Sequence, residues 1–310
     1  MSQLINSDTF LPAGSTVATI GVFDGVHLGH ATLVGKLREY AQEHRLKSLV
    51  ITFGQHPQQV LAPERDLQLI QPLAERIEAL NALQPDGVLV LDFTPQLAAL
   101  DSRTFMQLLR DRYGVRALIA GYNHRFGHDS NATFESYREI GHDLGIDVVK
   151  APEYLGEYAP VSSTIIRGLI RAGKVDDAMR CLTRPYRLAG KVVHGFHNGR
   201  GIGFPTANVG YLDPTQILPH NGAYAVMVTV AGRRLQGRVN VGNRPTFNNG
   251  EAISIEVNIF DFDDDIYGQP IALEFIKFLR LEFKLGSIEQ LREQLTRDRD
   301  KSRKILQDFT

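Results

Sequence analysis

The chain of 310 residues is long enough for about two domains, each able to bury its own core. Its 34 basic and 35 acidic residues nearly cancel, which argues against nucleic acid as a partner and favours small molecules held by local charge. A single cysteine excludes an internal disulfide and a zinc site of several thiolates, and no run approaches the ~18 apolar residues of a membrane span, so we expect a cytoplasmic protein without a membrane partner.

Residues 1–183 alternate short apolar runs with longer helical patterns. The apolar runs predict five strands, over 17–23, 48–53, 87–93, 117–121 and 146–151. Apolar residues at helical spacing between them predict helices, around 33–41, 72–83 and 104–114. Strands that alternate with helices form a parallel sheet covered on both faces. We therefore expect a Rossmann-like α/β domain whose ligands bind beyond the carboxyl ends of its strands.

The first predicted strand runs into a glycine-rich segment with two histidines, GVFDGVHLGH (21–30). Glycines let the backbone approach a ligand, and the start of the next helix favours phosphates. His27 and His30 could there stabilise charge in a transition state. A phosphate nucleophile is already an anion, so such a site needs no base. Two histidines alone would more simply be a helix cap and a surface residue, and a zinc site would need a third ligand.

The histidine segment resembles the HxGH motif of the nucleotidyltransferase superfamily, and VSSTIIR (161–167) resembles its second signature, ISSTxIR. The resemblance implies that His27 and His30 hold the ATP phosphates and stabilise adenylyl transfer. It also implies contacts to ATP or its phosphates from Gly21, Phe23, Gly29, Ser163, Thr164 and Arg167. A class I aminoacyl-tRNA synthetase shares the histidine motif but would also need a KMSKS-like loop, which the sequence lacks.

Two further segments, TFGQHPQQVL (52–61) and GYNHRFG (121–127), resemble the flavin-side motifs of bacterial FAD synthetases. The resemblance implies that His56 and Pro57 lie at the flavin and that Asn123 contacts the nucleotide or the flavin. A turn that ends the preceding strand is an equally good interpretation of the His56–Pro57 pair.

After residue 183 the chain becomes rich in short strands separated by Gly, Asn and Asp turns. These runs predict strands over 187–193, 223–232, 233–242, 253–262 and 271–279. With no helix between them, they indicate a small antiparallel β-barrel, followed by a charged C-terminal helix over 287–306. We therefore predict two domains, 1–183 and 184–310.

The second domain contains a glycine-rich loop, HGFHNGRGIGFPTANV (194–209). Its glycines and an arginine could form a backbone nest for phosphates, and Thr206 and Asn208 offer neutral oxygen ligands for a magnesium ion shared with ATP. The composition alone is equally compatible with a flexible loop. The candidate phosphate contacts are Gly199, Arg200 and Gly203.

This loop, VNVGNRPTF (239–247) and IEVNIFDFDDDIYG (255–268) together resemble riboflavin kinase. The kinase nucleophile is a hydroxyl, which has a proton to lose and needs a base. The family motif gives that role to Glu256, which the strand pattern alone would make an ordinary exposed residue. Arg280 and Glu282 match an Arg-x-Glu motif near the flavin.

Two other motifs carry no chemistry in our interpretation. GLIRAGK (168–174) resembles a Walker loop, but Val175 replaces the magnesium-binding Ser or Thr, and Gly173 is better explained as a helix C-cap. DFDDD (261–265) lacks the glycine and glutamate of a calcium loop and predicts a turn between strands. Cys181, in a helical pattern, is expected to be a packing residue.

Three positions depart from the family patterns. His124 and Pro160 stand where the adenylyltransferase family often has an aromatic and a basic residue, and Asp264 stands where many kinases have glycine. The first two bear on the FMN pocket, and the third bears on the turn.

The whole sequence therefore predicts a bifunctional enzyme of flavin cofactor synthesis. It would phosphorylate riboflavin to FMN and then adenylylate FMN to FAD with release of pyrophosphate, using ATP and Mg²⁺ in each step. The alternatives are a riboflavin kinase with an inactive adenylyltransferase domain, and a non-catalytic flavin or nucleotide sensor. The sequence leaves a homo-oligomer open.

Overall fold

The protein is described by a computed structural model that covers residues 3–5, 9, 11–121, 126–129, 133–194, 203–211, 213–245, 251–282 and 286–309. The candidates Asn123, Gly199 and Arg200, and the departure at His124, lie outside these residues. The chain divides into two compact units, 1–163 and 164–310.

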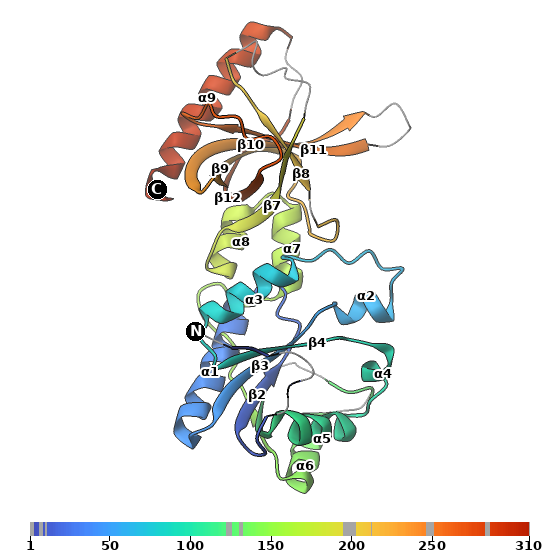
Figure 1. Ribbon diagram of the computed structural model, residues 1–310. Coiled ribbons are helices and arrows are strands. Elements are labelled where there is room, and N and C mark those ends of the chain that lie inside the picture. The colour runs from blue at the N-terminus through green and yellow to red at the C-terminus, as the bar shows by residue number, and fades with distance from the viewer. Residues whose placement is uncertain are drawn as a thin grey trace. The chain divides into compact units, whose positions relative to one another are not determined.

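The first unit is built on a six-stranded parallel sheet with the order β1-β4-β3-β2-β5-β6 (Figure 1). Its strands are β1 (Gln3–Ile5), β2 (Thr16–Ile20), β3 (Lys47–Phe53), β4 (Gly87–Leu91), β5 (Val115–Ala120) and β6 (Asp147–Lys150). Five of them confirm the sequence prediction. The sixth, β1, was missed because a three-residue edge strand is too short to show an apolar pattern.

Helices cover both faces of this sheet, as predicted for a parallel sheet (Figure 1). The helices are α1 (Leu28–His44), α2 (Pro57–Leu61), α3 (Leu73–Ala82), α4 (Pro95–Ala98), α5 (Ser102–Tyr113) and α6 (Phe134–Leu144). Val50 packs in one apolar core with Leu37 of α1 and Leu80 of α3. Its neighbour Ile51 packs in the other core with Met106 of α5. Successive residues of the strand thus face opposite layers.

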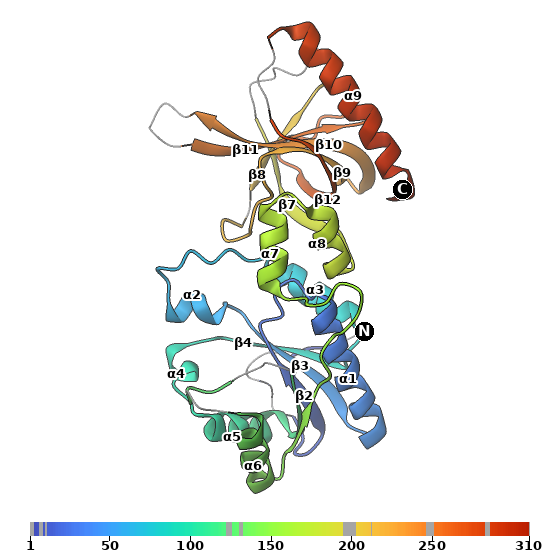
Figure 2. The same cartoon turned by 180° about the vertical axis from the view of Figure 1, so that it is seen from behind.

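The second unit is a closed antiparallel barrel with the order β10-β11-β8-β7-β12-β9. Its elements are α7 (Ser163–Arg171, which starts at the last residue of the first unit), α8 (Val175–Leu182), β7 (Tyr186–Val193), β8 (Ala207–Tyr211), β9 (Gly222–Val230), β10 (Arg233–Pro245), β11 (Glu251–Ile259), β12 (Pro270–Arg280), α9 (Ile288–Leu306) and the 3-10 turn η2 (Gln307–Phe309). Figure 2 shows α9 along the barrel, where it contacts β9, β10 and β12. The predicted barrel and C-terminal helix are confirmed, but β8 was expected to be loop.

The contact division at 163/164 falls earlier than the sequence boundary at 183/184. Helix α8 contacts β7 and β12, so it packs with the barrel. The sequence prediction assigned it to the first domain because its residues show a helical pattern. Cys181 on α8 is buried, as expected of a packing residue. Gly173 ends α7 with φ +73°, and its amide donates to the Ile170 carbonyl, which confirms the predicted C-cap. No helix in the described part of the chain is long and apolar enough to cross a membrane.

Candidate active sites

The loop between β2 and α1 has an unusual backbone. Phe23, Gly25 and Val26 all have positive φ, of 55°, 88° and 42°. The β-branched Val26 is rarely found there, and its amide closes a tight turn on the Phe23 carbonyl at 3.0 Å. Such a conformation persists only where surrounding contacts hold it, and it is concentrated at functional sites.

Buried hydrogen bonds hold this loop in place. The Asp24 carboxylate is 2% exposed and accepts the Ile70 amide through both oxygens, at 2.9 and 3.1 Å. The Asp24 carbonyl accepts the Ser163 hydroxyl at 2.8 Å. Ser163 belongs to the second signature, so the fold brings the start of that signature to the histidine loop.

The two candidate histidines lie against each other at the start of α1. Their rings stack with centroids 3.7 Å apart, and His27 is the N-cap residue. The His27 amide donates to His30 Nδ1 at 3.3 Å, so a neutral His30 carries its proton on Nε2 and keeps it as a donor. The edge of the Phe23 ring packs against His30 at 5.0 Å.

Two predicted glycines leave room for these rings. A Cβ on Gly29 would lie 3.2 Å from the His27 ring, and one on Gly21 would lie 3.1 Å from the Phe23 ring. Thr164 and Arg167 lie on α7 in the second unit, where Thr164 is exposed and Arg167 is half-buried.

The histidine loop presents two imidazoles and the N-terminus of a 17-residue helix, an arrangement that suits phosphate.

The predicted flavin-side residues lie after β3. His56 is buried and caps the short helix α2, because its Nδ1 accepts the Gln58 amide at 3.1 Å. Pro57 is the first residue of α2. The pair therefore forms a helix start rather than a simple turn, and a neutral His56 carries its proton on Nε2. Its contact with flavin remains a prediction.

In the barrel, two candidate side chains and one further polar side chain form a row across adjacent strands. Glu256 of β11 is paired directly with Asn208 of β8 on one side and Asn240 of β10 on the other. Directly paired residues share a face of the sheet. The neighbours of Glu256 along β11, Ile255 and Val257, are buried in the barrel, so the row faces outward. The fold thus brings the predicted base beside a predicted magnesium ligand.

The row continues to the predicted Arg-x-Glu motif at the end of β12. The side-chain amide of Asn240 donates through Nδ2 to Glu282 Oε1 at 2.5 Å. Gly242 makes room for that carboxylate, because a Cβ there would lie 2.6 Å from the same oxygen. The sequence reasoning missed Asn240 as a contact of the site, although it lies in the quoted motif at 239–247, because its partners are set by strand register.

Arg280 is held from the C-terminal helix. Its Nη2 and Nε lie 2.8 and 3.0 Å from Asp298 Oδ2 of α9. Arg238 of β10 donates to the same carboxylate at 3.3 Å. Burial lowers the pKa of Arg238, and the negative charge of Asp298 opposes that shift. Asp298 is therefore the anion that two arginines share beside the row, and no sequence motif pointed to it.

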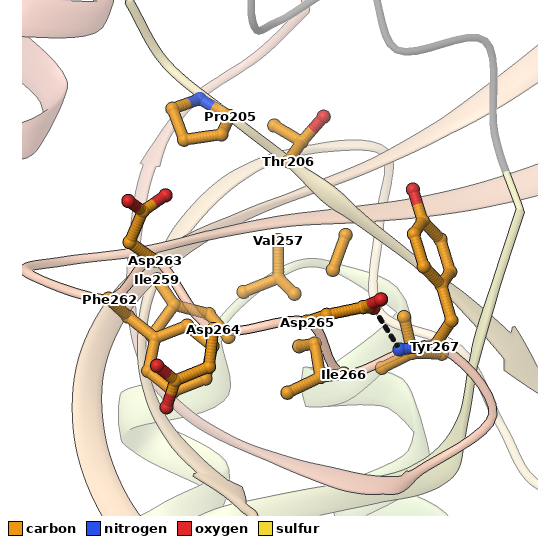
Figure 3. Close-up of a pocket in the computed structure, with 12 residues that line it drawn as sticks. Pro205, Thr206, Val257, Ile259, Phe262, Asp263, Asp264, Asp265, Ile266 and Tyr267 are labelled. Atoms are coloured by element: carbon orange, nitrogen blue, oxygen red, sulfur yellow. Dashed lines mark hydrogen bonds between the residues drawn. The ribbon is translucent and has the colours of Figure 1, made fainter.

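A pocket opens next to Thr206, between the chain before β8 and the loop that joins β11 to β12 (Figure 3). Asp263, Asp264 and Asp265 line one side, and Asp265 accepts the Tyr267 amide at 3.1 Å. Arg233 pairs with Asp264. The remaining lining residues are Val192, Pro205, Thr206, Ala207, Val257, Ile259, Phe262, Ile266 and Tyr267. The predicted turn at 261–265 is confirmed, and it also forms a wall of this pocket.

Comparison with known proteins assigns the two halves separately. The FAD synthetase family model matches residues 12–165, and the riboflavin kinase family model matches residues 182–306. A Bacillus subtilis protein named bifunctional riboflavin kinase/FMN adenylyltransferase is 35% identical, over 93% of this chain and 91% of its own. The chain belongs to the bifunctional riboflavin kinase/FMN adenylyltransferase family.

Other relatives agree over nearly the whole length. The Pseudomonas fluorescens protein of the same name is 35% identical over 91% of this chain and 90% of its own. The corresponding Escherichia coli K12 protein is 33% identical over 93% of this chain and 91% of its own. A crystal structure described as a macrolide-efflux protein from Streptococcus pneumoniae superposes with TM-score 0.87 at 31% identity, covering 97% of this chain and 98% of that one. The family, fold and pair of activities predicted from the sequence are confirmed.

Proposed function

We propose that residues 184–310 phosphorylate riboflavin to FMN, that residues 1–183 adenylylate FMN to FAD, and that Mg²⁺ serves both steps. One observation carries the assignment of chemistry to sites. The barrel directs a carboxylate outward between two amides, whereas the sheet directs stacked imidazoles and a helix N-terminus to its ligand. The first arrangement can remove a proton, and the second can stabilise phosphate charge.

In the kinase step, Glu256 takes the proton of the riboflavin hydroxyl as its oxygen attacks the γ-phosphorus of ATP, and ADP leaves. Thr206 immediately precedes β8, and Asn208 is the second residue of that strand, so the two side chains are close in sequence at the start of β8. A hydroxyl and an amide oxygen are hard, neutral ligands that suit Mg²⁺ while phosphate oxygens and water complete its coordination. The bound ion would neutralise charge on the transferred phosphoryl group.

The pocket beside Thr206 is the place for the nucleoside of ATP. Its apolar walls and the Phe262 and Tyr267 rings suit a flat base. The aspartates of the same loop repel phosphates, so the phosphates would point toward Thr206, Asn208 and the glycine-rich loop. Gly203, exposed with φ +81°, lies at the described end of that loop.

In the adenylylation step, a phosphate oxygen of FMN attacks the α-phosphorus of ATP and pyrophosphate leaves. No base is required, because the nucleophile is already an anion. His27 and His30 donate hydrogen bonds to the phosphates as charge shifts onto the leaving group, and the N-terminus of α1 adds its partial positive charge. Ser163, the last residue of the same unit, supplies a further phosphate contact.

The test is to incubate the pure protein with riboflavin, ATP and Mg²⁺ and to separate the flavins. FMN and FAD are expected, and chelation of the metal should stop both. FMN alone would favour a kinase with an inactive adenylyltransferase domain, and unchanged riboflavin would favour a sensor. These substrates and the reduced, buried thiol of Cys181 fit a cytoplasmic enzyme.

A further inference from the structure

A buried arginine outside every motif binds the backbone beneath the adenylyltransferase site. Arg76 of α3 is 2% exposed. Its Nη1 donates to the Val22 carbonyl at 2.9 Å, and its Nη2 donates to the Phe53 carbonyl at 2.6 Å. Charge-assisted hydrogen bonds of this kind are about twice as strong as neutral ones.

The two carbonyls belong to chains that leave neighbouring parallel strands. Val22 lies in the histidine loop, two residues after β2 ends, and Phe53 is the last residue of β3, three residues before His56. One planar guanidinium therefore joins the segment that carries His27 and His30 to the segment that carries His56. Under the proposed function, the first segment holds ATP and the second holds the flavin.

This arrangement is costly if its only role is to fill space. Among the described residues Arg76 makes no ion pair, and its buried Nε has no hydrogen-bond partner. Burial lowers the pKa of Arg76, and only the charge of Asp24 opposes that shift. Apolar side chains of similar volume often replace buried charges without loss of stability, so packing alone does not account for an arginine here.

We propose that Arg76 is a positioning residue for adenylyl transfer, which sets the distance between the ATP-side loop and the flavin-side helix start. The inference rests on the proposed function of those two segments. Transfer requires the FMN phosphate and the α-phosphorus of ATP in near contact, and a misplacement of about 1 Å can cost about 10²-fold in rate. Each substrate would still find its own half of the site.

The test compares Arg76→Met and Arg76→Lys with Arg112→Met. Met keeps the volume and removes the donors, whereas Lys keeps the charge but cannot match the planar fork. Arg112 is a matched control, because it lies on helix α5 of the same unit, on the other face of the sheet, over the Tyr113 ring. For Arg76→Met we expect kcat for FAD formation to fall about 10- to 100-fold.

The other readouts separate positioning from a structural role. The KM values for ATP and FMN should change less than about twofold, and riboflavin phosphorylation should not change. Arg76→Lys should recover part of kcat, and Arg112→Met should match the wild type. If Arg76→Met does not fold, the Lys variant still has to show the split between kcat and KM. A folded Arg76 variant with wild-type kcat, or one that loses binding of either substrate in step with rate, overturns the proposal.

Amide hydrogen exchange tests the same contact without relying on activity. Exchange in 21–30 and in 53–59 should rise together in Arg76→Met and stay unchanged in Arg112→Met. Failure of the wild type to make FAD would reject the proposed function, whereas unchanged exchange would reject the role of Arg76. The two failures are therefore distinguishable.

Discussion

Under the proposed function, the sheet site and the barrel site both break a phosphoanhydride bond of ATP, yet they are built from different kinds of side chain. At the barrel, charged side chains surround the candidate site: Glu256 stands in a row of amides, and Asp298 holds two arginines nearby. At the sheet, the carboxylate of Asp24 is bound by a backbone amide, and imidazoles with a helix N-terminus remain for the ligand. The nucleophile explains the difference, because a hydroxyl must lose a proton and a phosphate need not.

The largest expected difference between the two sites comes from substitution of Glu256. Glu256→Gln keeps the shape and removes the base, so riboflavin phosphorylation should fall about 10²- to 10⁴-fold. Conversion of supplied FMN to FAD should be unchanged. Ser254→Ala is the matched control, since Ser254 lies two residues earlier on the same face of β11. Normal phosphorylation by the Gln variant would leave Glu256 an ordinary strand residue.

Substitution of the histidine pair should have the reverse effect, with FAD formation lost and FMN formation retained. His27→Ala or His30→Ala should lower kcat for FAD formation about 10²- to 10³-fold, the scale of a lost oxyanion donor, while FMN formation continues. The control is His44→Ala at the other end of α1, where the ring stacks on Tyr40. Wild-type FAD formation by the double alanine variant would show that the site lies elsewhere.

Substitution of Asp298 measures how much the stability of the barrel and its kinase activity depend on a buried charge. Asp298→Ala leaves Arg238 and Arg280 without their shared anion, and breaking a buried pair in this way costs about 3–5 kcal/mol. Urea unfolding of the variant should show a lower midpoint for the barrel, with loss of kinase activity. FAD formation from FMN should persist at temperatures where the first unit stays folded. An unchanged midpoint would mean that the arginines find other partners.

The smallest expected effect is a difference in stability between fragments cut at the two possible domain boundaries, near 184 and at 164. Fragments 186–310 and 164–310 should both make FMN and no FAD. The longer fragment should be more stable by about 2–4 kcal/mol, because α8 buries Val175, Ala178 and Leu182 in the barrel unit. Urea unfolding of both fragments measures the difference. An unfolded or kinase-inactive 164–310 fragment would contradict two separable modules.

Most long elements were predicted from the sequence, although the 11-residue helix α6 was not, and the short strands β1 and β8 were missed. The strands from β2 to β6 show apolar runs, whereas β1 has three residues and β8 lies in a Gly-, Pro- and Asn-rich segment that resembles a loop. The proposed ligand contacts lie in motifs, so resemblance could point to them. Arg76, Asn240 and Asp298 act through backbone or side-chain partners distant in sequence, and only strand register and helix packing bring those partners together.

Closure of the barrel also bears on aggregation. Every barrel strand has a partner on both sides, so the described strand edges open to a foreign chain are those of β1 and β6 in the first unit. Both are short, and β6 begins with Asp147 and ends with Lys150. Short strands, and charged ones such as β6, are poor templates for further strand pairing. Of the twelve strands in the described residues, only two short ones therefore have an edge at which an intermolecular sheet could start.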